Sequence, residues 1–222
     1  HAQFLMRESP AAAIAFLEDF LQRNPSAREA ELLLARALVG ERRYADAKQH
    51  FNRLLEVYPN SPDVVYAIAI LALQQDDKTL AETHLKHFVT LRGPDKSTAY
   101  YYLGQLAEEG RRDGEALTHY AQVVSGENYL SAQIRRARLL AQQGQLDQAR
   151  DVLRNAKTEG AEQGVQLLVA EASLLREAKR VQEAFDLLEG RLAEQPEQPD
   201  LIYETALLAE RLNNVELMDA RL

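Results

Sequence analysis

Small residues recur along this chain at nearly constant intervals. One series of alanines is spaced by 34, 34, 35, 33 and 35 residues and consists of Ala13, Ala47, Ala81, Ala116, Ala149 and Ala184. A second series of small residues accompanies it and consists of Ala35, Ala69, Gly104, Ala137, Ala172 and Ala206. The offset between the two series is constant at 12 for every pair from Ala35 and Ala47 to Ala172 and Ala184. Such a fixed period is typical of a repeat protein, in which each unit stacks on its neighbours.

The constant offset between the series predicts two antiparallel helices that cross where both carry a small side chain. Helix axes approach to about 8–10 Å, depending on the side chains at the contact, so a leucine at either place would push them apart. We expect helices of about 12–15 residues joined by short turns, and Ser9 followed by Pro10 predicts the start of one of them. The units are predicted to span 28–61, 62–96, 97–129, 130–164 and 165–198, with partial units at 1–27 and 199–222.

The remaining places of the unit identify a family. Large residues stand near the predicted centre of each second helix, namely Leu17, Phe51, Leu85, Tyr120, Leu153 and Leu188. Prolines close three of the units, at Pro25, Pro59 and Pro196. The chain therefore resembles the tetratricopeptide repeat (TPR) family, whose units have about 34 residues, two helices and a closing proline. The resemblance implies an all-α solenoid of antiparallel helix pairs that forms a right-handed superhelix and, taking 1–222 together, a single array.

Some residues depart from the family pattern. Arg136 and Glu171 occupy the seventh place of their units, where three other units carry Leu34, Ile68 and Leu103. Arg191 is a further departure, near the end of a predicted second helix, and the chain has no tryptophan. The seventh unit has Met218 where the first series would place an alanine.

Composition narrows the function classes. A formal net charge of −8 disfavours nucleic acid as a partner, because that binding depends on neutralising phosphates. The absence of cysteine excludes thiol catalysis and thiolate metal sites. No apolar run approaches the ~20 residues of a membrane span, so we expect no direct membrane insertion of this segment. Hydrophobic residues at 46% and charged residues at 27% of both signs argue against disorder.

The chain carries no pattern that indicates catalysis, and we expect no enzyme activity, no cofactor and no metal. It has no glycine-rich phosphate loop, nucleophile elbow or HExxH motif. His84 and His87 could share a helix face as a metal pair, but a zinc site needs three or four ligands. His50, His84 and His119 fall at the same place in successive units, too far apart to converge, and we favour solvated histidines on the outer face.

The TPR resemblance places the ligand surface on the first helix of each unit, which lines a concave groove in that family. At the fifth place of the units all six residues are apolar or aromatic, namely Leu32, Tyr66, Tyr101, Ile134, Val169 and Tyr203. The ninth place is mixed and reads Arg36, Ile70, Gln105, Arg138, Ser173 and Leu207. We predict that this groove binds protein or peptide segments, with the arginines orienting an acidic group. The fifth place could instead be core between neighbouring first helices.

Two functions of different class stay open. The first is a non-catalytic scaffold or adaptor that binds partner segments, and the second is a structural spacer. The stretches Tyr102–Glu109, His119–Val123 and Leu201–Glu210 resemble proteobacterial outer-membrane TPR lipoproteins, some of which act as adaptors of a carboxyl-terminal processing protease. That resemblance implies a periplasmic, outer-membrane-associated location, with a cytoplasmic one not excluded.

Both ends of the chain fall inside predicted units. Ala13 belongs to a second helix whose partner would lie upstream of His1, so we interpret the chain as part of a longer protein. We expect fraying of residues 1–9 and 212–222, or self-association through these ends, because an apolar face would be left open there.

Overall fold

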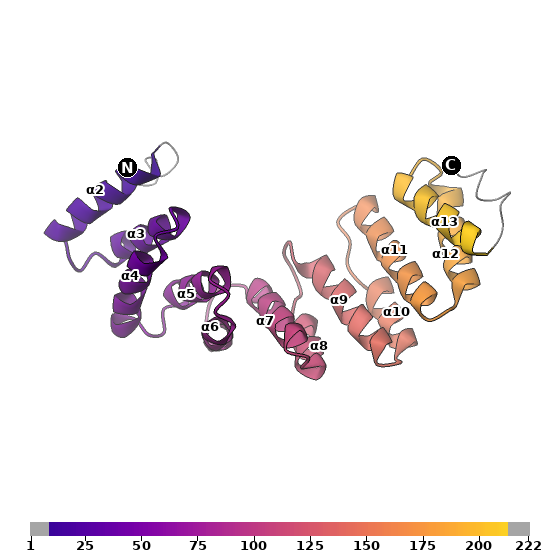
Figure 1. The fold of residues 1–222 in the computed structure, drawn as a ribbon, viewed down its shortest axis with the longest axis horizontal. Helices are drawn as coiled ribbons and strands as arrows, with labels where there is room; N and C mark the ends of the chain where they lie inside the picture. Colours follow the sequence, from indigo (N-terminus) through magenta and orange to yellow (C-terminus); the bar gives the residue numbers. More distant parts are fainter. Residues whose placement is uncertain (1–8, 213–222) are drawn as a thin grey trace. The chain divides into compact units, whose positions relative to one another are not determined.

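The computed structural model describes residues 9–212, and this part of the chain contains twelve α-helices and no strand (Figure 1). The helices are α2 (Pro10–Arg23), α3 (Arg28–Gly40), α4 (Tyr44–Val57), α5 (Pro62–Gln74), α6 (Lys78–Thr90), α7 (Ser97–Glu109), α8 (Asp113–Ala121), α9 (Tyr129–Gln142), α10 (Leu146–Arg154), α11 (Ala161–Glu177), α12 (Val181–Glu194) and α13 (Pro199–Arg211). The predicted all-α class is confirmed. The expectations for Met218 and for the chain ends lie almost entirely outside the described residues.

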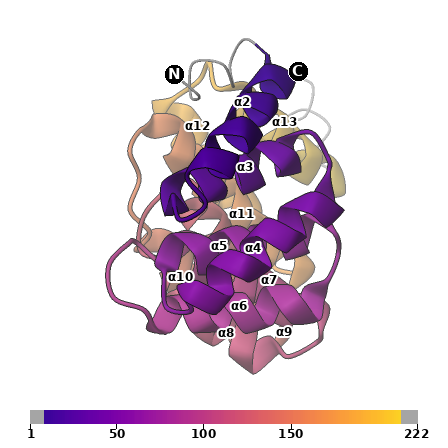
Figure 2. The same ribbon diagram turned by 90° about the vertical axis from the view of Figure 1, so that its left-hand side faces the viewer.

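The helices form two compact units, divided after Leu106 within α7. Consecutive helices pack as antiparallel pairs inside each unit, for instance α3 with α4 and α5 with α6 (Figures 1 and 2). In the second unit α9 pairs with α10, and α11 with α12. Neighbouring first helices also touch, because α3 contacts α5 and α9 contacts α11.

The first alanine series forms the tightest part of the core. All six alanines, from Ala13 to Ala184, have 0% of their surface exposed. The two small residues of one repeat can belong to the same hydrophobic cluster. Ala35 and Ala47 share one cluster, and Ala69 and Ala81 share another. The six large residues near the second-helix centres, from Leu17 to Leu188, are at most 2% exposed. Small residues thus occupy the closest approach of two helices, with large ones filling the space beside it.

Replacing Ala81 with leucine is expected to lower the free energy of unfolding by about 1.5 kcal/mol, because the added atoms must separate α5 from α6. The matched control is Ala45→Leu, at an exposed position in the first turn of α4, which should change stability by less than about 0.5 kcal/mol. Chemical denaturation measures both variants. Equal stability of the two would disprove the helix-contact role of the alanine series.

The turn inside each complete repeat carries one residue in the left-handed backbone region. This is the fifteenth residue of the predicted unit in all five cases, with φ of 59° at Arg42, 56° at Asp76, 55° at Arg111, 79° at Gly144 and 63° at Lys179. The backbone amide of the next residue then closes the turn on the first helix, as Arg43 does on the carbonyl of Leu38 at 2.8 Å. Only glycine adopts this region without strain, and glycine occupies this position in one of the five turns, at Gly144.

We therefore expect opposite effects from two substitutions at equivalent places. Lys179→Gly should raise the free energy of unfolding by about 0.5–1 kcal/mol, because it removes the backbone strain of a non-glycine residue at positive φ. Gly144→Ala should lower it by about 1 kcal/mol through backbone strain alone, since a Cβ there would meet no atom within 4 Å. Thermal denaturation of both proteins tests this, and effects of the same sign would contradict it.

Two second helices are shorter than predicted. α8 and α10 have nine residues each, whereas α4, α6 and α12 have 13 or 14. The expected helix length is therefore wrong for α8 and α10, and also for α11, which has 17 residues and begins four positions before the predicted unit boundary at 165. Non-helical segments at 122–128 and 155–160 take the place of the missing turns.

Candidate protein-binding surface

The six apolar residues of the predicted groove differ in how much surface they offer. Leu32 is 5% exposed and belongs to the hydrophobic cluster of the first unit, so its assignment to a binding surface is wrong. Tyr66, Tyr101, Ile134 and Val169 are half-buried and present one edge to solvent. Tyr203 on α13 is 58% exposed. The fifth place is therefore core at one end of the series and open surface at the other.

In the first unit, Tyr66 lines a hollow between α3, α5 and the start of α7 with a cavity volume of ≈ 580 Å³. Its ring packs against Phe88 of α6, with ring centroids 4.9 Å apart and planes inclined by 41°. Pro94 and Thr98 add apolar and hydroxyl surface, and Arg36 of α3 stands at the edge. We call this site the Tyr66 hollow. It has the size of a pocket that takes a side chain or a small ligand.

Asp63 at the start of α5 also lines the Tyr66 hollow, but its carboxylate is engaged by the protein itself. The Arg28 guanidinium donates to it at 2.6 Å, and the Ser61 hydroxyl donates to the same carboxylate. Partial burial raises the pKa of Asp63, yet the bonds from Ser61 and Arg28 outweigh it and hold the pKa below its ordinary value of 3.8. Arg28 also lies over the ring of Tyr58, 5.3 Å from its centroid. This cluster joins the first helices of consecutive repeats.

On α7, two predicted groove residues bond to each other. The Gln105 amide donates to the Tyr101 hydroxyl at 3.3 Å, one turn apart on the helix. The ring of Tyr101 also contacts that of Tyr102, at 5.9 Å between centroids. Tyr101 is thereby held in place with its ring half-exposed, as suits a preformed contact surface. Ile70, at the ninth place of α5, is half-buried.

In the second unit, Ile134 and Arg138 of α9 face Val169 and Ser173 of α11 across a smaller hollow of ≈ 220 Å³. Gln166 and Glu177 of α11 form its polar edges. We call this site the Ile134 hollow. Its lining includes the fifth and ninth places of two adjacent repeats, the places to which the TPR resemblance assigns the groove.

The two arginines at the ninth place, Arg36 and Arg138, are exposed, and within residues 9–212 neither guanidinium has a hydrogen bond or an ion pair. Most helical arginines of the described chain are paired, as Arg53 is with Glu31 and Arg176 with Glu204. An unpaired arginine beside an apolar hollow is available to a carboxylate of a partner.

Sequence reasoning missed the residues that the second helices and loops contribute. Phe88, Pro94 and Asp95 line the Tyr66 hollow, and Leu153 lines the Ile134 hollow, although none lies on a first helix. The prediction considered only first-helix places. Pro94, one position off the closing-proline register, was the signal that the loop before α7 reaches this surface.

The histidines do not form a metal site in the part of the chain that the structure describes, where no three potential ligands cluster. The expectation of freely solvated histidines is also wrong in detail. His50 is half-buried with Nδ1 3.2 Å from the carboxylate of Glu31, and His87 Nε2 lies 3.1 Å from the Asn60 side-chain oxygen. His84 is half-buried, and its Nδ1 has no hydrogen-bond partner.

Mild acid is expected to destabilise the fold through His84. Burial, and then the nearby positive charge of His87, lower the pKa of His84 below its ordinary value of 6.5. The unfolded chain therefore binds a proton more readily, so the stability is complete above pH 6.5 and declines as the pH falls from there through the folded pKa. Denaturation curves between pH 7.5 and 5 should show this decline, with less of it in His84→Gln. An equal decline in that variant would exclude His84 as the cause.

Comparison with known proteins decides the family. Two models of the tetratricopeptide repeat match the sequence, one over residues 4–71 and the other over residues 66–129. The chain belongs to the tetratricopeptide repeat family. A TPR repeat-containing protein of Pseudomonas aeruginosa is 34% identical over 121 residues, which cover 54% of this chain and 20% of that protein. The chain thus spans about a fifth of this relative's length.

Solved TPR structures resemble the fold at low sequence identity. YrrB, described as a TPR protein with an unusual peptide-binding site, superposes with a TM-score of 0.63 at 16% identity and covers 84% of this chain and 96% of its own. The type IV pilus biogenesis factor PilW gives 0.59 at 18% identity and covers 90% and 93%. A TPR protein from Parabacteroides merdae gives 0.62 at 14% identity and covers 99% and 86%. These likenesses establish the fold.

The departures from the TPR pattern now have structural explanations. Glu171 is 2% exposed on α11 and accepts hydrogen bonds from Arg150 at 2.7 Å and Arg154 at 3.2 Å, both on α10 of the preceding repeat. A buried ion pair thus replaces the apolar contact of the other units. Arg136 is half-buried and faces a hollow, so its place is not core in this repeat. Arg191 is exposed and pairs with Glu194 at 3.4 Å.

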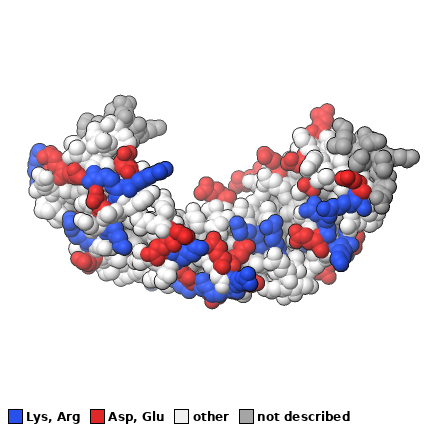
Figure 3. Space-filling model, in the orientation of Figure 1, with Lys and Arg blue, Asp and Glu red and all other residues white. Residues whose placement is uncertain are grey.

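Charged side chains of both signs are distributed over the surface. In Figure 3 cations and carboxylates are interspersed on the face shown, with no broad area of positive charge. The helices among residues 9–212 are too short or too polar to cross a bilayer.

Proposed function

We propose that this TPR chain is a non-catalytic scaffold that binds segments of a partner protein along its first helices. The repeats and their structural relatives support a protein–protein interaction scaffold in general terms. The observation that carries the specific proposal is that each of the two compact units has an apolar hollow on its first helices. An arginine that is unpaired among the described residues lies beside each hollow, Arg36 in the first and Arg138 in the second.

The proposed contact residues are Arg36, Tyr66, Ile70, Tyr101 and Gln105 in the first compact unit, and Ile134, Arg138, Val169 and Tyr203 in the second. Apolar side chains of the partner would enter the hollows, since burial of apolar area supplies most of the affinity in helix-in-groove recognition. Tyrosine suits such a surface because it gives a large contact area at low entropy cost. The arginines would pair with partner carboxylates, and that part of the affinity weakens with salt.

Affinity capture with matched surface variants tests the proposal. Arg36→Asp, Arg138→Asp and Tyr203→Asp combined change only exposed residues, so the fold should be retained. The immobilised parent should retain a partner that the triple variant loses, whereas Val57→Asp, at a residue 63% exposed on a second helix, should retain it. Equal capture by the triple variant would exclude this surface, and a parent that captures nothing would favour the spacer function.

A narrower proposal concerns the partner's identity. The stretches Tyr102–Glu109 and Leu201–Glu210 resemble outer-membrane TPR lipoproteins, and we propose on that ground a periplasmic adaptor of a carboxyl-terminal processing protease. Self-association through the ends of the array would be a competing use of the chain. Co-purification with the protease, and light scattering of the isolated chain, distinguish the two.

A further inference from the structure

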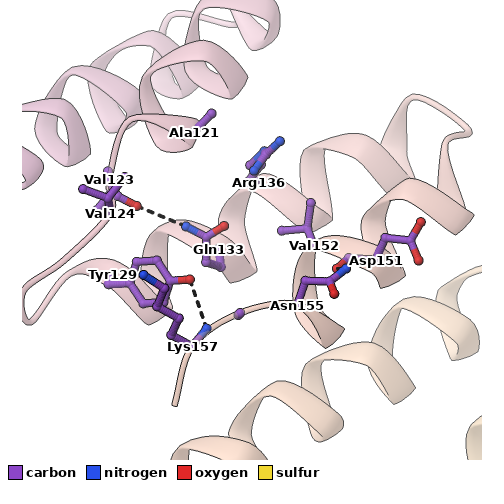
Figure 4. A pocket seen from close by; sticks show the side chains of 11 residues that line it. Ala121, Val123, Val124, Tyr129, Gln133, Arg136, Asp151, Val152, Asn155 and Lys157 are labelled. Atoms are coloured by element: carbon purple, nitrogen blue, oxygen red, sulfur yellow. Dashed lines mark hydrogen bonds between the residues drawn. The ribbon is translucent and has the colours of Figure 1, made fainter. Parts of the chain in front are cut away.

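A further hollow lies between α8, α9 and α10, away from the proposed binding surface (Figure 4). Its cavity volume is ≈ 400 Å³, against ≈ 220 Å³ for the Ile134 hollow in the same compact unit. It lies where the two nine-residue helices α8 and α10 end, and the segments that follow them form part of its wall. We call it the Arg136 hollow.

The Arg136 hollow and the Ile134 hollow lie on different faces of α9. Tyr129, Gln133 and Arg136 are spaced by four and three residues and line the first, whereas Ile134 and Arg138 line the second. At about 100° per residue, the centres of these two sets are about 150° apart around the helix. A ligand in the Arg136 hollow therefore occupies a site of its own.

Two hydrogen bonds hold the walls of the Arg136 hollow. The buried Gln133 side chain donates from Nε2 to the carbonyl of Val123 at 3.3 Å, and the amide of Lys157 donates to the Tyr129 hydroxyl at 3.1 Å (Figure 4). The first bond ties the segment after α8 to α9, and the second ties the segment after α10 to it.

The lining combines an apolar floor with positive charge. Val124, in the segment after α8, is 63% exposed, and Val152 of α10 is half-buried and lies across the hollow from it (Figure 4). Arg136 and Lys157 also line it, and within the described chain neither side chain has a hydrogen bond or an ion pair. The lining carboxylate, Asp151, has no ion pair with either cation. Two unpaired cations in a lining that also holds one exposed and one half-buried valine favour a ligand that is both apolar and anionic.

We propose that the Arg136 hollow binds a second kind of partner segment, in which an aliphatic residue is followed directly by Asp or Glu. The aliphatic side chain lies between Val124 and Val152, and the carboxylate accepts hydrogen bonds from the Arg136 guanidinium, while the Lys157 ammonium adds positive charge on the opposite side of the hollow. The net positive lining selects the acidic peptide, and the open, shallow shape suits a segment of a protein. This site is separate from the Tyr66 hollow and the Ile134 hollow, so the proposal does not rest on binding at either of them.

The probe is the hexapeptide acetyl-Gly-Ser-Leu-Glu-Ser-Gly-amide, titrated into the ¹⁵N-labelled 222-residue chain and followed by NMR. Amide signals of residues 121–136 and 151–157 should shift together, and the Leu-Gln counterpart should bind about tenfold more weakly because it lacks the charge. Shifts confined to Val169, Ser173 and their neighbours on α11 would place the peptide in the Ile134 hollow and overturn the proposal. Absence of shifts at millimolar peptide would overturn it as well.

Two variants separate binding from folding. Arg136→Gln should weaken binding of the Leu-Glu peptide about tenfold and leave the weak Leu-Gln affinity unchanged, because the lost group acts on the carboxylate. Arg111→Gln is the control, since Arg111 is an exposed arginine with no ion pair among the described residues and lies in the turn before α8. Unchanged affinity in Arg136→Gln would overturn the proposal. Val124→Asp, at an exposed floor position, should abolish binding while the circular dichroism spectrum stays that of the parent.

Discussion

Glu171→Ala is expected to lower the free energy of unfolding by about 3 kcal/mol, the largest stability effect predicted for this chain. The Glu171 side chain is 3% exposed and pairs with Arg150, which is itself 16% exposed, at 2.7 Å. Its removal leaves the Arg150 guanidinium charged, largely desolvated and with only a distant carboxylate, that of Glu183 at 3.8 Å. Leaving one member of a buried pair uncompensated costs more than the pair itself contributes.

The control for Glu171→Ala is Glu177→Ala on the same helix, where the glutamate is exposed and, within residues 9–212, unpaired. It should change stability by less than about 0.5 kcal/mol. A second variant, Glu171→Leu combined with Arg150→Met, replaces the pair by apolar side chains and should recover much of the loss. Urea denaturation measures all three, and a loss in Glu171→Ala no greater than in the control would contradict the structural role.

Tyr66→Ala combined with Tyr101→Ala is expected to weaken binding of the captured partner by at least about 2 kcal/mol, or roughly thirtyfold. Tyr66 forms a wall of the Tyr66 hollow against Phe88, and Tyr101 presents a half-exposed ring held by Gln105. Both are half-buried, so some stability is lost with the rings, but the core cluster around Leu85 and Leu103 is retained.

Calorimetric titration of the tyrosine variant is paired with a thermal melt. Val57→Ala shortens a solvent-exposed apolar side chain on α4 and serves as the control for non-specific effects. If the folded tyrosine variant binds as tightly as the parent, the first helices are not the binding site, and the partner must contact another face of the protein.

The fold could be predicted because its determinants are periodic and local. Small residues at a fixed offset specify where two helices cross, and the structure buries all of them, from Ala13 to Ala206. The early ends of α8 and α10 could not be predicted from the repeat period, although the sequence carries local signals for them. Val123 and Val124, followed by Ser125 and Gly126, weaken a helix, and the side chain of Asn155 donates to the carbonyl of Asp151 at the end of α10.

The candidate site was less predictable because burial depends on neighbours in space. Leu32 and Tyr66 occupy the same place of successive units, yet Leu32 is covered by the hydrophobic cluster around it and Tyr66 is not. The ion pair of Glu171 with Arg150 joins residues 21 positions apart, and the period marked Glu171 only as an exception. A repeat pattern thus predicts which face a residue lies on, whereas its exposure depends on the particular side chains of the adjacent units.

Site-specific photo-cross-linking tests the central claim most directly, because it reports contact with a partner that has not yet been identified. A photoreactive phenylalanine analogue is placed at Tyr66, Ile134 or Tyr203 on the first helices, and at Val57 on a second helix as the control. The proposal predicts that the first three positions cross-link to one and the same partner protein and that position 57 does not. Cross-links at position 57 with none at the other three would contradict a binding surface on the first helices.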